Sequence, residues 1–238
     1  MWFRCCVALL AVLCCSCDKV VRKSWHEKYG WEAETYFEDG GVVELCDAIE
    51  RNNLDEVERL IASGVDVNAL GRGGMTPLVW AFPDGKFERF ELLLKHGADP
   101  SIVTTSDFGT AGKLQKGTTV AHETAMLKDG RHFLAIVRAG VDPDLKAQCG
   151  RTELNLVQAI LSISYKFDSR GLESRVVALL RLKPNQSTLN EAVATAINSS
   201  EFGIALRLFE AGAELEKSIS FLGYAAAFGL GGTTRRQC

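Results

Sequence analysis

The chain has 238 residues, a formal net charge of −3 at pH 7 and 47% hydrophobic residues. Because a mildly acidic chain is a poor polyelectrolyte partner for nucleic acid, we expect no nucleic-acid binding. The apolar content is sufficient for a sizeable core, arranged as one solenoid or as one large domain.

The first 17 residues have the pattern of a secretory signal. Arg4 is followed by an apolar run over residues 5–15, which is too short to span a bilayer but suits the hydrophobic part of a secretory signal. The small residue Ser16 precedes Cys17, and the segment thereby resembles a bacterial lipoprotein signal, which implies that Cys17 becomes the lipidated N-terminus. Cys14 departs from the pattern, because Leu usually occupies that position. A soluble exported protein cut nearby and an uncleaved anchor are the alternatives.

This signal predicts an exported protein of the cell envelope, held to the membrane by a lipid anchor and facing the periplasm. Asp18 directly follows Cys17 and resembles the inner-membrane retention signal of some proteobacterial lipoproteins. That interpretation requires a host with such a sorting system, so the sequence leaves the choice between inner and outer membrane open.

Residues 18–40 are charged and aromatic, and we expect them to form a tether followed by an N-terminal cap. Residues 18–30 would let the domain stand off the membrane. The terminal units of a repeat array need a cap over their apolar face. Trp25 has an alternative place at the lipid interface. The aromatic residues that could pack in the cap are Trp25, Tyr29, Trp31, Tyr36 and Phe37.

The cap is followed by a unit that occurs twice in register. Leu45 and Leu78 are 33 residues apart, as are Gly64 and Gly97, and a fixed period of this size indicates a solenoid. Within each unit, apolar residues recur three and four positions apart, which predicts two short amphipathic helices. Gly64 and Gly97 lie where the second helix should end, because glycine adopts the left-handed conformation without strain.

The start of the second unit carries a family resemblance. Thr76 can cap a helix, and Pro77 suits its first turn. Together with residues 55–69 and 92–100, this segment resembles the ankyrin repeat, a 33-residue unit with a β-turn hairpin and two antiparallel helices. The resemblance implies an all-α repeat solenoid, an ankyrin-like stack of helix-turn-helix units joined by β-turn hairpins. It is clearest over residues 42–101.

The third unit retains the pattern with an insertion. Residues 119–122 stand in the place of the family's Thr-Pro-Leu-His motif, and Gly140 repeats the end of the second helix. Gly97 and Gly140 are 43 residues apart, which leaves about ten extra residues. We place these in residues 104–117 and expect an elongated hairpin or loop there.

A fourth and a fifth unit follow. Thr152 lies 33 residues after Thr119 and marks the fourth unit, which begins at Gly150. An insertion of about ten residues falls between its helices, around residues 163–172. The fifth unit occupies residues 189–216. The predicted organisation is a signal peptide over 1–17, a tether and cap over 18–40, about five repeats with a partial C-terminal cap repeat over 41–228, and a flexible tail over 229–238.

The residue pattern gives no indication of metal or cofactor chemistry. The four histidines include no pair with the spacing and intervening glutamate of a helical zinc site. His122 occupies the place of the family's motif histidine, whose role there is to bond the neighbouring hairpin backbone. We therefore expect no cofactor, no metal and no catalytic residue. The residues expected to have structural roles are Thr76, Pro77, Gly64, Gly97, His122, Gly140 and Gly212.

The resemblance also implies a concave groove lined by inner helices and hairpin tips, where exposed side chains determine which partner binds. Trp80 has two interpretations: an exposed aromatic residue suits a binding hot spot, whereas packing against adjacent helices would make it core. The candidates for partner binding are Asp47, Trp80, Glu123, Leu156 and Thr195 on the inner helices, with Arg72, Phe108 and Lys113 at hairpin tips.

We therefore predict a non-catalytic protein–protein interaction module, an envelope lipoprotein that binds another protein through the groove. One alternative is a periplasmic immunity or inhibitor protein against a toxin or hydrolase. Another is a structural envelope protein that self-associates through its caps. The remaining alternative is an enzyme whose site is built by the insertions 104–117 and 163–172, with Asp107, Lys113, Lys116, Asp168 and Arg170.

Overall fold

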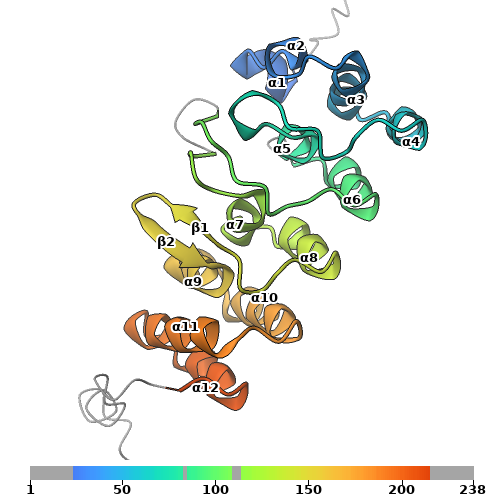
Figure 1. Cartoon of the computed structure of the whole chain (residues 1–238). Coiled ribbons are helices and arrows are strands. Elements are labelled where there is room, and N and C mark those ends of the chain that lie inside the picture. Colours follow the sequence, from blue (N-terminus) through green and yellow to red (C-terminus); the bar gives the residue numbers. More distant parts are fainter. Residues whose placement is uncertain (1–23, 83–84, 109–113, 215–238) are drawn as a thin grey trace, which may run out of the picture.

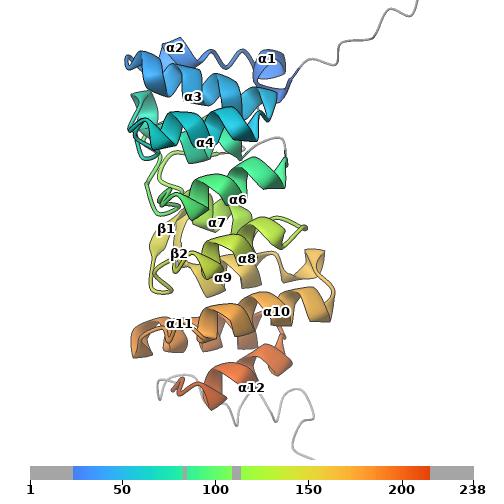
Figure 2. The ribbon, with the colours of Figure 1, turned by 90° about the vertical axis from the view of Figure 1, so that its right-hand side faces the viewer.

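The computed structural model describes residues 24–82, 85–108 and 114–214. These residues form a stack of helix pairs (Figures 1 and 2), in which each pair packs on the next pair along the chain. The predicted helical repeat solenoid is thereby confirmed. The signal peptide, Cys17, Lys113, the C-terminal cap and the tail are predictions that lie outside the described residues.

The stack has an inner and an outer row of helices. In Figure 1 the outer row lies on the right, while the inner row and the hairpins lie to its left. The N-terminal helices are α1 (Trp25–Tyr29) and α2 (Ala33–Tyr36). The inner helices are α3 (Gly40–Arg51), α5 (Pro77–Ala81), α7 (Val120–Ala125), α9 (Leu156–Ser162) and α11 (Gln186–Asn198). The outer helices are α4 (Leu54–Ala62), α6 (Phe87–Lys95), α8 (Arg131–Arg138), α10 (Ser169–Leu180) and α12 (Phe202–Glu210).

Capping residues determine where these helices begin and end. The hydroxyl of Thr76 accepts a hydrogen bond from the Val79 N–H at 3.1 Å. The hydroxyl of Thr119 accepts one from the His122 N–H at 3.3 Å. Such caps satisfy backbone donors that have no partner in the first turn. Four outer helices are followed by a glycine at positive φ: Gly64 (98°), Gly97 (84°), Gly140 (84°) and Gly212 (103°).

Two hairpins project from the stack. Strands β1 (Lys146–Cys149) and β2 (Thr152–Asn155) pair antiparallel, with Cys149 opposite Thr152. The second, the insertion hairpin, has described arms over residues 103–108 and 114–119, which are joined by bridges between Val103 and Thr119 and between Phe108 and Leu114. The remaining short elements are the 3₁₀ turns η1 (Arg72–Gly74) and η2 (Ser164–Lys166), of which η2 lies in the insertion between α9 and α10.

The fourth unit begins its inner helix later than its 33-residue spacing indicates. Thr152 lies in β2 and does not cap a helix. The cap is Asn155, whose Oδ1 accepts a hydrogen bond from the Gln158 N–H at 2.9 Å. The hairpin is therefore three residues longer than expected, and Leu156 becomes the first residue of α9.

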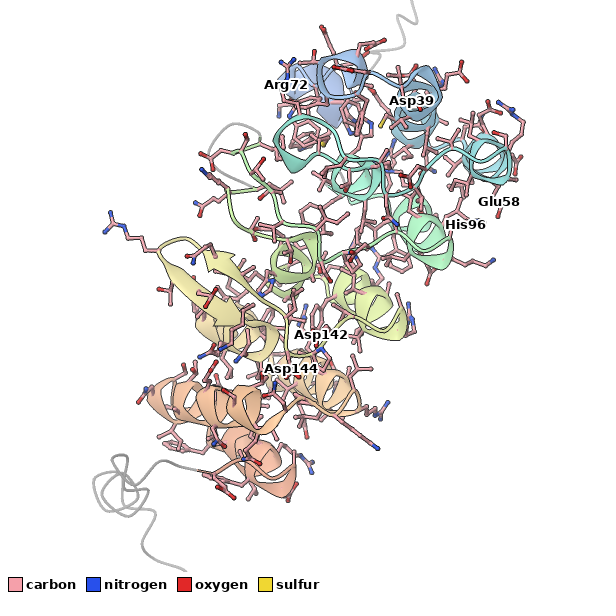
Figure 3. The ribbon with its side chains drawn as sticks, in the orientation of Figure 1. Asp39, Glu58, Arg72, His96, Asp142 and Asp144 are labelled. Carbon is pink, nitrogen blue, oxygen red and sulfur yellow. The ribbon has the colours of Figure 1, made fainter. Side chains whose placement is uncertain are left out.

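Turns between units repeat one hydrogen-bonding pattern, in which an aspartate Oδ1 accepts from the backbone N–H two residues later, as Asp66 and Asp99 do at 2.8 Å. Asp142 Oδ1 accepts a hydrogen bond from the Asp144 N–H at 2.9 Å, in the loop that leads from α8 to β1 (Figure 3). Asp144 Oδ1 in turn accepts one from the Asn185 N–H at 2.9 Å, at the start of α11. The loop between the third and fourth units thus fixes the helix start of the fifth unit.

Across residues 24–82, 85–108 and 114–214, no helix combines the length and apolar character that crossing a bilayer requires.

Candidate functional site

The N-terminal segment, which contains α1 and α2 and precedes α3, covers the inner face of the first two units. The Trp80 side chain is 1% exposed, and its Nε1–H donates a hydrogen bond to the Cys46 carbonyl oxygen at 2.9 Å. His26 stacks on it with ring centroids 4.4 Å apart, and Trp31 lies against it at 5.6 Å. Trp80 was considered as an exposed residue for partner binding, but His26 and Trp31 of the same chain cover its side chain. The packing alternative describes Trp80 in this structure.

The same segment explains the position of Phe108. This residue was expected at an exposed hairpin tip, but it is 4% exposed. Its ring contacts the rings of Trp31 and Tyr36 at centroid distances of 6.0 and 5.9 Å. Phe108 therefore joins the insertion hairpin to the N-terminal segment, and its expected exposure to a partner is corrected.

Leu156 is also corrected as a partner-binding residue. Its side chain is fully buried, with 0% exposure. The cap at Asn155 makes Leu156 the first residue of α9, equivalent to Pro77 in α5, and both positions point into the core. The expected partner position was derived from Thr152 as the start of the unit, so the longer hairpin accounts for the error.

Four of the expected partner positions keep some exposure. Arg72 is exposed in the 3₁₀ turn η1, on the opposite side of the molecule from Glu58 of α4 (Figure 3). Asp47, Glu123 and Thr195 are half-buried on the inner helices. Burial raises the pKa of Asp47, and its carboxylate lies near the Arg51 guanidinium.

Thr195 is held by two hydrogen bonds. Its Oγ1 accepts from Gln158 Nε2 at 3.2 Å and donates to the Glu191 carbonyl oxygen at 3.0 Å. Thr195 thus links the inner helices α9 and α11 on the face where a partner was expected.

His122 joins the third unit to the fourth. Its Nε2–H donates to the Leu154 carbonyl oxygen at 2.9 Å, and its Nδ1 accepts from the Thr119 hydroxyl at 2.9 Å. The ring is fully buried, and burial lowers its pKa to about 4. A neutral imidazole with both nitrogens occupied has a structural role in this position.

A pocket of about 460 Å³ opens between the insertion hairpin and the β1–β2 hairpin, above the inner helices α7 and α9. The Glu123 carboxylate forms part of its wall, and Oε1 accepts a hydrogen bond from the Thr118 hydroxyl at 3.0 Å. Burial raises the pKa of Glu123 to about 7, against the smaller opposing effect of the Thr118 bond. Other residues that line the pocket include Gln115, Met126, Cys149, Leu154 and Ser162.

Cys149 faces the same pocket as a neutral thiol. Burial, followed by the nearby Glu123 carboxylate, raises the pKa of the thiol to about 11. A thiol with such a pKa is a poor nucleophile, because the thiolate is the reactive form.

The residues considered for an enzyme site have local structural contacts. Asp107 Oδ1 accepts a hydrogen bond from the Lys116 N–H at 2.7 Å inside the insertion hairpin. Asp168 Oδ1 accepts one from the Gly171 N–H at 2.6 Å and caps α10. The hairpin lies on the inner side and α10 on the outer side of the stack (Figure 1), so the two insertions are not brought together. Among the residues that the structure describes, no cluster of three His, Cys, Asp or Glu side chains could hold a metal ion.

A larger groove, of about 590 Å³, lies between the outer helices α4, α6 and α8. Its wall contains the ion pair between Arg138 and Glu91, with 3.0 Å between nitrogen and oxygen. Asp55, Glu58 and Lys95 also line it. We prefer the smaller inner pocket as the candidate site, because it combines a half-buried carboxylate with walls from two hairpins.

Comparisons with known proteins agree with this architecture. Residues 45–94 match the family described as ankyrin repeats (many copies). The chain is 30% identical over 119 residues to cyclin-dependent kinase 4 inhibitor B of Bos taurus, covering 50% of this chain and 83% of that protein. It is 25% identical over 209 residues to the mitochondrial disaggregase of Bos taurus, covering 76% of this chain and only 28% of that protein.

A solved structure supports the same fold. The crystal structure of an ankyrin repeat domain from Acinetobacter baumannii superposes with a TM-score of 0.54 and 21% identity, covering 71% of this chain and 81% of that one.

Proposed function

This chain belongs to the ankyrin repeat family, and from that premise we propose that it is a non-catalytic module that binds another protein through its inner face. Proteins built from these repeats mediate protein–protein interactions. The partner would lie along α7, α9 and α11, because the N-terminal segment covers the inner face of α5.

The pocket between the two hairpins is the observation that supports this proposal most directly. It is bordered by the half-buried Glu123 and opens on the inner side, next to the linked inner helices α9 and α11. A stable complex buries about 800 Å² on each partner, which a row of inner helices with two hairpins is long enough to provide.

A pull-down from envelope extract with the full chain tests the proposal. Thr195→Arg adds a bulky positive charge to the inner face, and we expect it to abolish recovery of the partner. Glu58→Gln is the matched control, because it changes the net charge by the same amount on the exposed outer surface of α4. Equal recovery with both variants would contradict binding at the inner face.

We also propose that the protein is an exported envelope lipoprotein, anchored through Cys17 and facing the periplasm. The apolar run over residues 5–15 and the small residue before Cys17 support this. Mass spectrometry of the purified protein tests it: we expect a mature chain that begins at Cys17 with acyl groups attached. An uncleaved N-terminus, or a Cys17→Ser variant that remains in the membrane fraction, would contradict the lipid anchor.

A second candidate is an immunity or inhibitor protein. It is supported by the similarity to a relative whose name describes an inhibitor of cyclin-dependent kinase 4. Such a protein should be encoded beside its target, and its expression should protect cells from that target. A lone gene without a neighbouring toxin or hydrolase would count against this candidate.

A further inference from the structure

Among the described residues, no Lys or Arg side chain forms an ion pair with the Glu123 carboxylate. Oε1 accepts one hydrogen bond, from the Thr118 hydroxyl, and neither an ion pair nor a second hydrogen bond involves the carboxylate there. Burying an ionised carboxylate away from water is costly unless it is paired. The second carboxylate oxygen is therefore available to a charged donor that enters the pocket.

The surroundings of Glu123 suit one type of side chain. Met126 and Leu154 supply apolar wall, whereas Gln115 supplies a polar amide at the insertion hairpin. Lys and Arg side chains place their alkyl stems along apolar surface and extend their charged heads to polar groups. The pocket thus combines a wall for the stem with an acceptor for the head.

We propose that the protein partner inserts a Lys or Arg side chain into this pocket and pairs its charged head with Glu123. This inference rests on the proposed function, because it identifies the chemistry of the partner at the same inner face. Charge complementarity supports it: the pocket offers a half-buried negative charge, and the described residues that line it include no Lys, Arg or His.

The titratable neighbours leave Glu123 as the group that responds to pH near neutrality. His122 precedes it on α7 and stays neutral, because burial lowers the imidazole pKa to about 4. Cys149 faces it from β1 and stays neutral, because its thiol has a pKa of about 11. A cation binds the ionised carboxylate. The affinity for the Lys or Arg side chain should therefore be highest above pH 7 and should fall as the pH drops below 7.

Selection from a random 12-residue peptide library on the full-length chain at pH 8 tests the inference. We expect enriched peptides to share a Lys or Arg, and replacement of that residue by norleucine to weaken binding roughly tenfold or more, because it removes a charge-assisted hydrogen bond. Glu123→Gln should weaken binding by a similar factor, and so should a change from pH 8 to pH 6. The Glu123→Gln variant should show no such pH dependence.

Glu58→Gln is the matched control, with the same change of charge outside the pocket, and should bind like the wild type. Peptides that bind the inner face, as shown by sensitivity to Thr195→Arg, but ignore Glu123→Gln would overturn this inference and leave the proposed function intact. Failure to enrich any peptide, or enrichment only of peptides that ignore both Thr195→Arg and Glu123→Gln, would overturn the proposed function itself. Circular dichroism of each variant verifies that it folds.

Discussion

The imidazole of His26 stacks on the indole of Trp80 with ring centroids 4.4 Å apart, and its Nε2–H donates a hydrogen bond to the Trp80 carbonyl oxygen at 2.8 Å. These two residues are 54 positions apart, and their contact ties the N-terminal segment to the second repeat. The segment therefore ends the accessible inner face at α5, and the surface left for a partner runs from α7 toward α11.

Trp80→Ala should destabilise the fold. The indole is nearly fully buried among His26, Trp31 and Tyr36. Truncating a buried aromatic residue leaves a cavity, so we expect a loss of about 3–5 kcal/mol in the free energy of unfolding, measured by urea denaturation. Tyr165→Ala is the control, because Tyr165 is 78% exposed and should change stability by less than about 0.5 kcal/mol. Equal losses for the two variants would contradict a packed Trp80.

The repeat itself was predictable because its signals are local. Helix periodicity, the cap at Thr76 and the glycines that follow the outer helices depend on residues close in sequence. The fourth unit was placed less well. The spacing from Thr119 to Thr152 suggested a helix start, but Asn155 caps the helix, since the extra residues lengthen the hairpin. Spacing alone does not distinguish a longer hairpin from an earlier helix.

The candidate site was only partly predictable for a different reason. The alignment of inner helices identified Glu123, but the opposite walls of its pocket come from the insertion hairpin and from β1 and β2. Likewise, Trp80 and Phe108 are covered by Trp31, which lies outside the repeats. Such contacts depend on how distant segments dock, and no repeat period specifies that.

Gly74→Ala should be more destabilising than Gly64→Ala. Both glycines have a positive φ, 80° and 98° respectively, which costs a non-glycine residue about 1–2 kcal/mol. A Cβ on Gly74 would also lie 2.8 Å from the Val103 carbonyl oxygen, whereas a Cβ on Gly64 would meet nothing within 4 Å. Gly74→Ala must therefore displace the insertion hairpin as well. Denaturation curves that coincide for the two variants would argue against this close approach.

Carbon-13 NMR should detect Glu123 titrating near pH 7, because burial raises its pKa to about 7. Thr118→Val should raise that pKa further, since the Thr118 hydroxyl donates to the carboxylate and favours its ionised form. Glu191 provides an internal control in the same spectra, because its hydrogen bond from Lys146 lowers its pKa. A Glu123 signal that titrates near pH 4.3, as in model peptides, would show that the carboxylate is solvated.

His122 and Glu123 should have opposing effects on stability as the pH changes. Burial lowers the pKa of His122 to about 4, below the value of about 6.5 for an unfolded histidine. The contribution of the neutral His122 to stability is therefore complete above pH 6.5 and is lost as the pH falls toward 4. Burial raises the pKa of Glu123 to about 7, above the unfolded value of about 4.3, so its contribution is complete below pH 4.3 and is lost as the pH rises toward 7.

Glu123→Gln should therefore leave a stability whose pH dependence comes from His122 alone of this pair. Each of the two pKa shifts corresponds to about 3 kcal/mol in the free energy of unfolding. In the wild type, the two opposing pH dependences largely cancel between pH 4.5 and 6.5. Urea denaturation at pH 7, 6, 5 and 4.5 measures this. Relative to the wild type, Glu123→Gln should lose stability as the pH falls, while His122→Gln should gain it. A loss of the Leu154 hydrogen bond in His122→Gln would shift its whole curve without changing that slope, because the bond does not titrate. Curves for both variants that run parallel to the wild type would contradict the two buried titrations.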